Sequence, residues 1–506
     1  MAAGEKVGAT LKLATTSGRP LPVTPGTLPK PKAPEIPHST FDKIRTKLNI
    51  SAKKTETAAT ILRHDGFKVQ PNLRVEMFKK NHLLDEFFGP KQMTFLENDQ
   101  PVRVSKGKKV QRPVVKEVVV AHDVYEVQDV IKYKRGVAQN ARVRVKYGMD
   151  GGQGSLKLCM SVITEKPEFS SPHKKKPRTP KALDDFKEDG VKKVVILAIG
   201  FEVKESYENM KTFLDELKIG LDEEATFAVD LKMLNIMLGL QGHSSKHPCP
   251  WCEGSQPWTT PAKLRTLGNI RENQKRYAKS GLDRDHLMKF MNCEFPPLIE
   301  GPGKKLILEV FPPMALHLYM GGTNHIKRGL HAKLTEFDKR FRKPKWAEAF
   351  KEWCEEKNIV GVRYWNQDLK GPKAIKLLEN SKELTEWLPN KDLKQFGICL
   401  QMLWEVKKSC FGLELNEGWD DRIQEFDKQF DKLGISKSNK VHAIVTHVPD
   451  FIKRTGEPLG RFSEQAMESV HQDWEKTWVD YKRGEIAESF HEQLFKCVVK
   501  YNSSHL

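Results

Sequence analysis

Two alternating segments joined by a glycine-rich turn constrain the fold more than any other feature of this 506-residue chain. RVRVKYGMD (142–150) alternates polar and apolar side chains, and LKLCMSVI (156–163) alternates again. Because successive side chains on a strand point to opposite faces, the pattern predicts two strands. The GGQGS between them is typical of a turn. We therefore expect a hairpin, with Asp150 where its first strand meets the turn.

Four further elements follow the hairpin, and their order indicates a fold. A continuous apolar run predicts a buried strand, and two helical patterns enclose a second strand that ends on Asp230. The segments are KKVVILAIGF (192–201), SYENMKTFLDELK (206–218), EATFAVD (224–230) and LKMLNIMLGL (231–240). This order fits the α/β RNase H-like fold. Active sites of that fold take carboxylates from the first strand, the fourth strand and a later helix.

A candidate for the later helix is RFSEQAMESVHQDWEKTWVDYKR (461–483). Ser463 can cap it. Glu464 and Glu468 are four residues apart and therefore share one face. Between about 250 and 440 the patterns are mostly helical, and we interpret this stretch as an insertion into the core.

Charge and cysteine content limit the classes of protein. Lys and Arg number 85 against 66 Asp and Glu, a net charge of +19. This excess favours a polyanionic partner, most simply double-stranded DNA, although it also serves solubility. Eight cysteines form no disulfide framework, and the sequence shows no signal peptide and no apolar run near the roughly 18 residues of a membrane span. We expect a reducing, intracellular compartment and no membrane partner.

A Cys-x-x-Cys pair, Cys249 and Cys252 in HPCPWCEG, raises the question of a metal site. Zinc sites combine such pairs with His-x3–5-His, and His442 and His447 have that spacing. Two Cys and two His would form one structural zinc site that pins both ends of the insertion. His243 and His247 are rival ligands, and a redox pair or ordinary core histidines are the other interpretations.

The expected fold class is therefore a mixed-sheet RNase H-like core interrupted by a large helical, zinc-clasped insertion. An N-terminal helical DNA-binding or dimerisation region precedes it, and its short helices also fit an ordinary helical subdomain. The expected parts are a disordered tail (1–37), the N-terminal region with a basic linker (38–135), the core in two pieces (136–248 and 449–506) and the insertion (249–448).

Several segments, taken in chain order, resemble the catalytic core of the RAG recombinase catalytic subunit and the Transib transposases. They are YGMDGGQGSLKLCMSV, VVILAIGFEVKESYENMKTFL, HAIVTHVPDFI and SEQAMES. Asp230 precedes Cys249 by 19 residues, which is the family's spacing between its second catalytic Asp and first zinc cysteine. The resemblance covers roughly residues 140–490.

The resemblance implies a DDE transposase in which Asp150, Asp230 and Glu468 bind two Mg²⁺ or Mn²⁺ ions. Glu464 is an alternative third acid, because this segment is one residue longer than in RAG; Glu468 is preferred because Glu-Ser follows it, as in the family. The resemblance also favours His442 and His447 as zinc ligands. Without it, Asp150 is an ordinary turn residue, Asp230 a helix cap and Glu468 a solvated carboxylate.

The implied reaction is cut-and-paste transposition by a homodimer in the nucleus. Water nicks one strand, the freed 3′-hydroxyl attacks the other to leave a hairpin on the flanking DNA, and the excised end joins target DNA. Candidate DNA contacts are Trp404 and Arg363, from similar family segments, and Lys174, Lys175, Lys176 and Arg178 in a basic loop that also fits a nuclear localisation signal or a solvated loop. His317 and Asn324 lie in another similar segment without an assigned role. The alternatives are a domesticated, inactive DNA-binding protein and an unrelated RNase H-like nuclease.

Overall fold

The structure, a computed structural model, describes residues 52–65, 67, 84–98, 111–135, 143–164, 193–219, 225–242, 244–258, 262–340, 345–362, 368–482 and 489–506. The chain divides into two compact units, residues 1–78 and 79–506. In the first unit the described element is helix α2 (Ala52–His64), which confirms the helix predicted from KKTETAATILRHDG. The expected tail and the helix predicted to begin near residue 39 lie outside the described residues.

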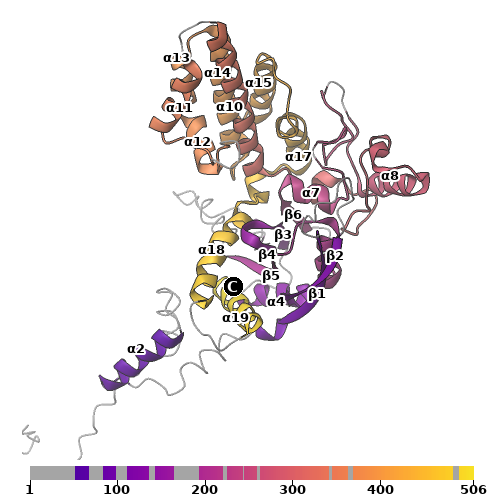
Figure 1. Ribbon diagram of the computed structural model, residues 1–506, viewed down its shortest axis with the longest axis vertical. Helices are drawn as coiled ribbons and strands as arrows, with labels where there is room; N and C mark the ends of the chain where they lie inside the picture. Colours follow the sequence, from indigo (N-terminus) through magenta and orange to yellow (C-terminus); the bar gives the residue numbers. More distant parts are fainter. Residues whose placement is uncertain are drawn as a thin grey trace, which may run out of the picture. The chain divides into compact units, whose positions relative to one another are not determined.

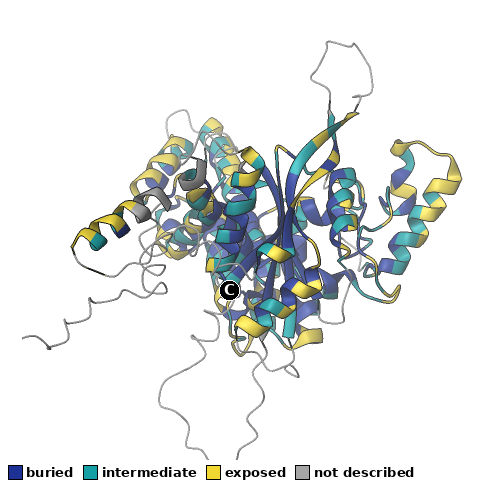
Figure 2. Ribbon diagram, turned by 90° about the horizontal axis from the view of Figure 1, so that it is seen from below, coloured by how far each residue is buried: buried dark blue, intermediate teal, exposed yellow. Residues whose placement is uncertain are grey.

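One six-stranded mixed sheet forms the centre of the second unit, in the order β1-β2-β5-β4-β3-β6 (Figure 1). The strands are β1 (Phe88–Asn98), β2 (Gln111–Ala121), β3 (Val143–Asp150), β4 (Ser155–Thr164), β5 (Val194–Phe201) and β6 (Ala225–Val229). Neighbouring strands are antiparallel except β3 and β6, which are parallel. The predicted hairpin is β3–β4, and the two further predicted strands are β5 and β6. Figure 2 shows the strands at the centre of the sheet as buried, whereas the outer strands β1 and β2 also carry exposed residues.

Residues 88–98 and 111–121, expected within a helical region and its basic linker, form strands instead. β1 and β2 pair with each other along their whole length, and Val118–Val120 of β2 pair with β5. Helix α4 (Val124–Lys134), capped by Asp123, follows. The basic segment around 111–121 is rich in β-branched residues, which suit a strand at the side of a sheet more than a linker.

Two helices beside the sheet follow its strands directly. α6 (Tyr207–Leu217) begins after Ser206, whose hydroxyl accepts from the Asn209 N–H, and α7 (Leu231–Met237) begins after Asp230, whose carboxylate accepts from the Met233 N–H. Side-chain oxygens at these positions satisfy N–H groups that the first helical turn leaves free. The expected order of hairpin, strand, helix, strand and helix is therefore confirmed.

Helix α18 (Gln465–Lys482) runs alongside β3 and covers the polar face of the β3–β4 hairpin. The Lys146 Nζ donates to the Ser463 carbonyl at 3.0 Å, and a Cβ on Gly148 would lie 2.5 Å from Met467. Four residues of a helix span about 6 Å and two residues of a strand span about 6.8 Å, so successive turns of α18 lie opposite alternate residues of β3. Glycine at 148 therefore allows the close approach that brings α18 to the end of β3. Ser463 lies two residues before the first residue of α18, and its hydroxyl accepts from the Gln465 N–H at 3.2 Å.

Helix α19 (Phe490–Ser504) packs on β1, β2 and β5. The Asn502 side chain accepts from the Ile196 N–H at 2.8 Å and donates to the Ile196 carbonyl at 2.9 Å. On the side away from β4, β5 pairs with β2 only at residues 198–200, so Ile196 lies beyond that ladder. The buried amide thus satisfies backbone groups of a strand at the centre of the sheet.

The stretch from about 250 to 440 is mostly helical, as predicted, in its described residues. Its helices are α8 (Leu267–Ser280), α9 (Ile307–Val310), α10 (Ala315–Arg340), α11 (Trp346–Glu356), α12 (Gly371–Glu379), α13 (Ser381–Trp387), α14 (Lys391–Cys410), α15 (Trp419–Asp431) and α16 (Asn439–His442). α10 contacts α11, α12, α14 and α16 (Figure 1). One hydrophobic core continues from the sheet into these helices. Among the described helices, none has the length and apolar character that crossing a bilayer requires.

Candidate functional site

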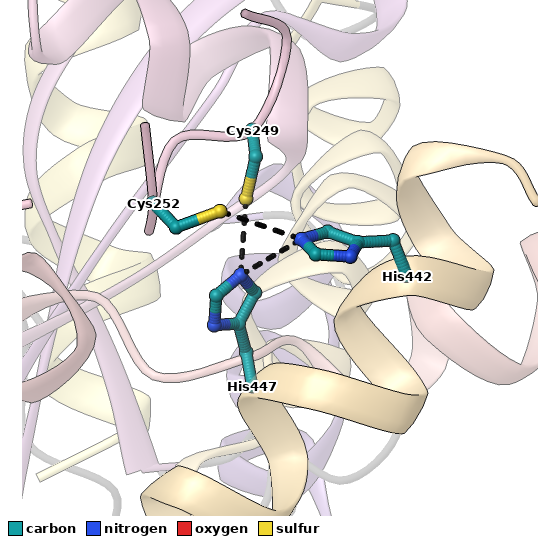
Figure 3. A group of neighbouring side chains, drawn as sticks. All are labelled: Cys249, Cys252, His442 and His447. Atoms are coloured by element: carbon teal, nitrogen blue, oxygen red, sulfur yellow. Dashed lines mark hydrogen bonds between the residues drawn. The ribbon is translucent and has the colours of Figure 1, made fainter. Parts of the chain in front are cut away.

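Four residues from two distant parts of the chain meet in a buried Cys2His2 cluster (Figure 3). Cys249 and Cys252 come from the loop after α7, and His442 and His447 from the turn between α16 and α17 (Val448–Thr455). Their ligand atoms all lie within 4.8 Å of one another. The structure therefore brings together the four residues that the sequence analysis paired.

The distances within this cluster fit a tetrahedral zinc ion. Zn–S bonds of about 2.3 Å and Zn–N bonds of about 2.0 Å place sulfur about 3.5 Å from nitrogen and two nitrogens about 3.3 Å apart. The Cys249 Sγ lies 3.2 Å from the His447 Nε2, and the Cys252 Sγ lies 3.4 Å from the His442 Nε2. The two Nε2 atoms are 3.2 Å apart. The cluster could therefore hold one zinc ion with little movement.

A π-helical turn lets two histidines five residues apart face one ion. Between α16 and α17 lies η6 (Ala443–His447), which has π-helical hydrogen bonding. Side chains five apart on an α-helix point about 140° apart, whereas the wider i→i+5 turn brings them nearly into line. Pro449, at the start of α17, has no N–H to donate to the preceding turn, so the α-helical ladder is interrupted here.

Buried neighbours hold the cluster in shape. The guanidinium of Arg265 is 1% exposed, and its Nε donates to the carbonyls of Cys249 and Cys252 at 3.1 and 2.9 Å. The Trp258 ring stacks on His442 with centroids 3.9 Å apart. A buried cation fixes the cysteine loop through charge-assisted hydrogen bonds, so the loop conformation does not depend on the metal alone.

The two thiols of the cluster differ in acidity. Hydrogen bonding to Cys249, and then to His442 and His447, lowers the pKa of Cys252. Burial, and then Cys252 itself, raises the pKa of Cys249. Zinc binds thiolates, so filling the cluster would release a proton from Cys249.

A second group of polar side chains lies at the edge of the sheet where β3 and β6 end. The two strands are parallel, and Met149 pairs with Val229. Asp150 and Asp230, the next residue of each strand, therefore leave the sheet side by side. Neighbouring strands are about 4.8 Å apart, which sets the spacing of the two backbones.

The two aspartates are held by different partners. The Asp230 Oδ1 accepts from the Met233 N–H at 2.6 Å, so Asp230 caps α7 and keeps a second oxygen for other contacts. The Asp150 Oδ2 lies 2.6 Å from the Nε2 of His471 on α18. Burial by itself would raise the pKa of Asp150, but the hydrogen bond from His471, together with nearby positive charge that includes Lys157, outweighs it and lowers that pKa.

The two candidate glutamates meet at His317, near the start of α10. The His317 Nδ1 lies 2.9 Å from the Glu464 Oε1, and its Nε2 lies 3.2 Å from the Glu468 Oε1. Glu464 also accepts from the His317 backbone N–H at 2.9 Å and is 2% exposed, and its Oε2 is buried without a hydrogen-bond partner. The Glu468 side chain is 38% exposed. Glu464 thus joins α10 to α18, whereas Glu468 is open to a ligand.

The pKa of Glu468 depends on the charges of both aspartates. Its pKa is raised to about 7: burial contributes most, His317 opposes the shift, and the charges of Glu464, Asp150 and Asp230 add to it. Carboxylates that disfavour one another's ionisation gain most from a shared cation. The acids are nevertheless spaced more widely than the zinc ligands: among the described residues, the Cys/His cluster is the one group whose ligand atoms all lie within 4.8 Å.

Three functional neighbours were not found from the sequence. His471 contacts Asp150, Lys157 contacts His471 at 2.9 Å, and Glu205 accepts from the Gly151 N–H at 2.9 Å while pairing with Lys232. His317 was noted without a role. The sequence offered one signal for them: His471 lies three residues after Glu468 and therefore on the same face of the helix.

The remaining candidate residues do not join either site. Trp404 packs against the hydrophobic core, with the Lys407 Nζ 4.9 Å from its ring centroid. The Asn324 side chain donates to the Leu369 carbonyl and accepts from its N–H, at 3.0 and 2.7 Å, so it joins α10 to the segment before α12. The His247 ring contacts the Glu253 carbonyl and is outside the zinc cluster. His243, Arg363, Lys174, Lys175, Lys176 and Arg178 lie outside the described residues.

Part of the chain matches a known protein family. Residues 183–275 match a family described as a domain of unknown function (DUF8703). The matching span contains Asp230 and both cysteines of the zinc cluster, and ends within α8. The curated proteins contain no match to the chain.

Proposed function

We propose that this protein is a DNA transposase of the DDE type, similar to the RAG and Transib recombinases. The observation that carries the proposal is the pairing of β3 with β6, which sets Asp150 beside Asp230, together with the raised pKa of Glu468 to which both aspartates contribute. Three acids from two strands and one late helix thereby share one sheet edge.

The sheet topology supports an RNase H-like core. β3, β4 and β5 form an antiparallel meander, and β6 joins β3 in parallel, which gives the order β5-β4-β3-β6. The order of elements along the chain is the one expected from the sequence, with the acids on the first and fourth of these strands. β1 and β2 extend the β5 side. Helices 267–455 then stand between the fourth strand and α18, as an insertion would.

In the proposed site, Asp150, Asp230 and Glu468 hold two divalent ions, Mg²⁺ or Mn²⁺. Such an ion pair supplies an activated nucleophile and stabilises the leaving oxygen of an in-line displacement on phosphorus. The residues of the chain have the hard oxygen atoms that Mg²⁺ prefers. His471 holds one oxygen of Asp150, α7 holds one oxygen of Asp230, and His317 holds Glu468. Each acid is therefore oriented by the protein before any ion arrives.

The other parts of the proposal concern zinc and DNA. One zinc ion in the Cys2His2 cluster clasps the loop after α7 to the turn between α16 and α17. The net charge of +19 suits double-stranded DNA, namely transposon ends and target, bound by a homodimer in the nucleus. Phosphate contacts of this kind make binding strongly dependent on salt.

Purified protein should nick DNA bearing the terminal inverted repeats of its own element, form hairpins and join ends when Mg²⁺ or Mn²⁺ is present. Asp150→Ala and Asp230→Ala should abolish these products and leave salt-sensitive DNA binding intact. Asp230→Asn is the matched control for the cap of α7, since Asn caps as well as Asp but carries no charge. It should retain the thermal stability of the wild type and lose activity.

Binding without cleavage by the wild type would instead identify a domesticated, inactive DNA-binding protein. Cleavage without strand transfer would identify a nuclease unrelated to transposition. Either result contradicts the proposal.

A further inference from the structure

A buried lysine and a buried histidine form a chain of contacts that ends on Asp150. Lys157 of β4 is 2% exposed and His471 of α18 is 7% exposed. The Lys157 Nζ lies 2.9 Å from the His471 Nδ1, and the His471 Nε2 lies 2.6 Å from the Asp150 Oδ2. The Lys157 Nζ also donates to the Ser155 hydroxyl at 2.5 Å. The proposed function used the contact between His471 and Asp150 but neither contact of Lys157.

The chemistry of the three groups fixes the direction of the hydrogen bonds. An ammonium group has donors only, so the His471 Nδ1 must accept from Lys157. The ring proton then belongs on Nε2, which donates to the Asp150 carboxylate. Lys157 thus selects the imidazole tautomer that can hold Asp150, much as second-shell groups do for metal-ligating histidines.

The backbone leaves room for this series of contacts between Lys157, His471 and Asp150. Asp150 and Lys157 are direct partners in the β3–β4 ladder, so both present side chains to the same face. A Cβ on Gly152 would lie only 3.1 Å from the His471 ring, so glycine at this position of the turn leaves room for the imidazole. Burial of an ammonium is costly without acceptors. Burial lowers the pKa of Lys157 to about 8, against the opposing effects of Cys159, Asp150 and Glu475. Hydrophobic packing alone would favour an uncharged residue here.

We propose that His471 and Lys157 are positioning residues that orient Asp150 for metal binding. The inference rests on the proposed function, because it assigns Asp150 to a divalent ion. His471 holds Oδ2 and leaves Oδ1 for the shared edge with Asp230. Loss of either residue frees the carboxylate to rotate, which weakens the metal site more than it weakens the fold.

The test is Mn²⁺ binding to zinc-loaded full-length protein without DNA, by calorimetry and by loss of the free Mn²⁺ electron paramagnetic resonance signal. Asp150→Asn identifies the binding that belongs to the acid site. His471→Leu and Lys157→Met should each raise the Mn²⁺ Kd about 10- to 100-fold, the usual effect of losing a second-shell partner. His471→Gln keeps an N–H donor near the Nε2 position and should raise the Kd less than His471→Leu does. Lys476→Met, an exposed lysine on the same helix, is the matched control and should leave the Kd unchanged.

The second readout is the Mn²⁺ concentration that gives half-maximal nicking, which should rise in parallel with the Kd. Unchanged Mn²⁺ binding in folded His471→Gln, His471→Leu and Lys157→Met proteins would overturn the inference while leaving the transposase proposal standing. If Leu or Met disrupts folding, a Kd for His471→Gln equal to that of the wild type overturns it alone. A wild type that neither binds Mn²⁺ nor nicks DNA overturns both.

Discussion

The two candidate metal sites differ in how their ligands are held. In the Cys2His2 cluster, soft ligands contact one another directly, with the His447 Nε2 3.2 Å from both the Cys249 Sγ and the His442 Nε2. At the sheet edge, the acids contact histidines and backbone N–H groups instead of one another. Sulfur and ring nitrogen atoms can approach closely by hydrogen bonding without an ion, whereas carboxylates repel one another. The ligands of the Cys2His2 cluster are therefore already close together before metal binds. The acids at the sheet edge are held in orientation but lie farther apart.

Among substitutions at the two sites, the largest effect is expected at the zinc cluster. Cys249→Ser or His447→Ala should lose the one zinc ion per chain and much of the thermal stability, because two distant segments lose their common ligand and leave buried polar atoms. Elemental analysis and thermal unfolding measure both effects.

Cys399→Ala is the control for losing a buried cysteine, since Cys399 is fully buried in α14 and outside the cluster. It should cost about 1–2 kcal/mol of unfolding free energy and keep the zinc. Full zinc content in Cys249→Ser would contradict the long-range cluster.

At the acid site, removing charge should affect activity and leave stability nearly unchanged. Glu468→Gln should reduce the nicking rate by more than about 100-fold, beyond what outer-shell residues usually contribute. Glu464→Gln should unfold at lower denaturant concentration, because its carboxylate joins His317 to α18, and retain more activity than Glu468→Gln. The reverse order of activities would make Glu464 the third acid.

The smallest expected effect is the dependence of Mn²⁺ affinity on pH. The pKa of Glu468 is raised to about 7, so its carboxyl is protonated below that pH and ionised above it. Protons compete with metal for this carboxylate, so Mn²⁺ affinity should fall as pH drops from 7 to 6, by at most about tenfold per unit. Calorimetry across this range measures the slope, which should flatten in Glu468→Gln. An equal slope in both proteins would exclude Glu468 as its source.

Much of the core could be predicted because its signals are local. The alternation of β3 and β4, the apolar run of β5 and the patterns of α6, β6 and α7 each specify an element within about ten residues. β1 and β2 were missed because lysines and prolines at an outer ribbon resemble a linker. They pair with each other, but only the pairing of Val118–Val120 with β5, far along the chain, joins them to the rest of the sheet.

The face that α18 covers was also misleading. Lys157, Cys159 and Ser161 alternate with apolar residues and so suggest a face toward water, yet all three are buried. α18 supplies partners such as His471 for this polar face. A helix some 300 residues away decides whether a polar residue on a strand is solvated or buried, and the strand itself carries no sign of it.

The sequence by itself determined the elements, the spacing of the cysteine and histidine pairs, and which acids end strands, since these depend on neighbouring residues. Only the tertiary structure decided that α18 lies along β3, that Glu464 is buried while Glu468 is reachable, and that Lys157 and His471 stand behind Asp150. Those outcomes depend on contacts between segments distant in the chain, and such contacts are set by packing and by the need to satisfy buried polar groups.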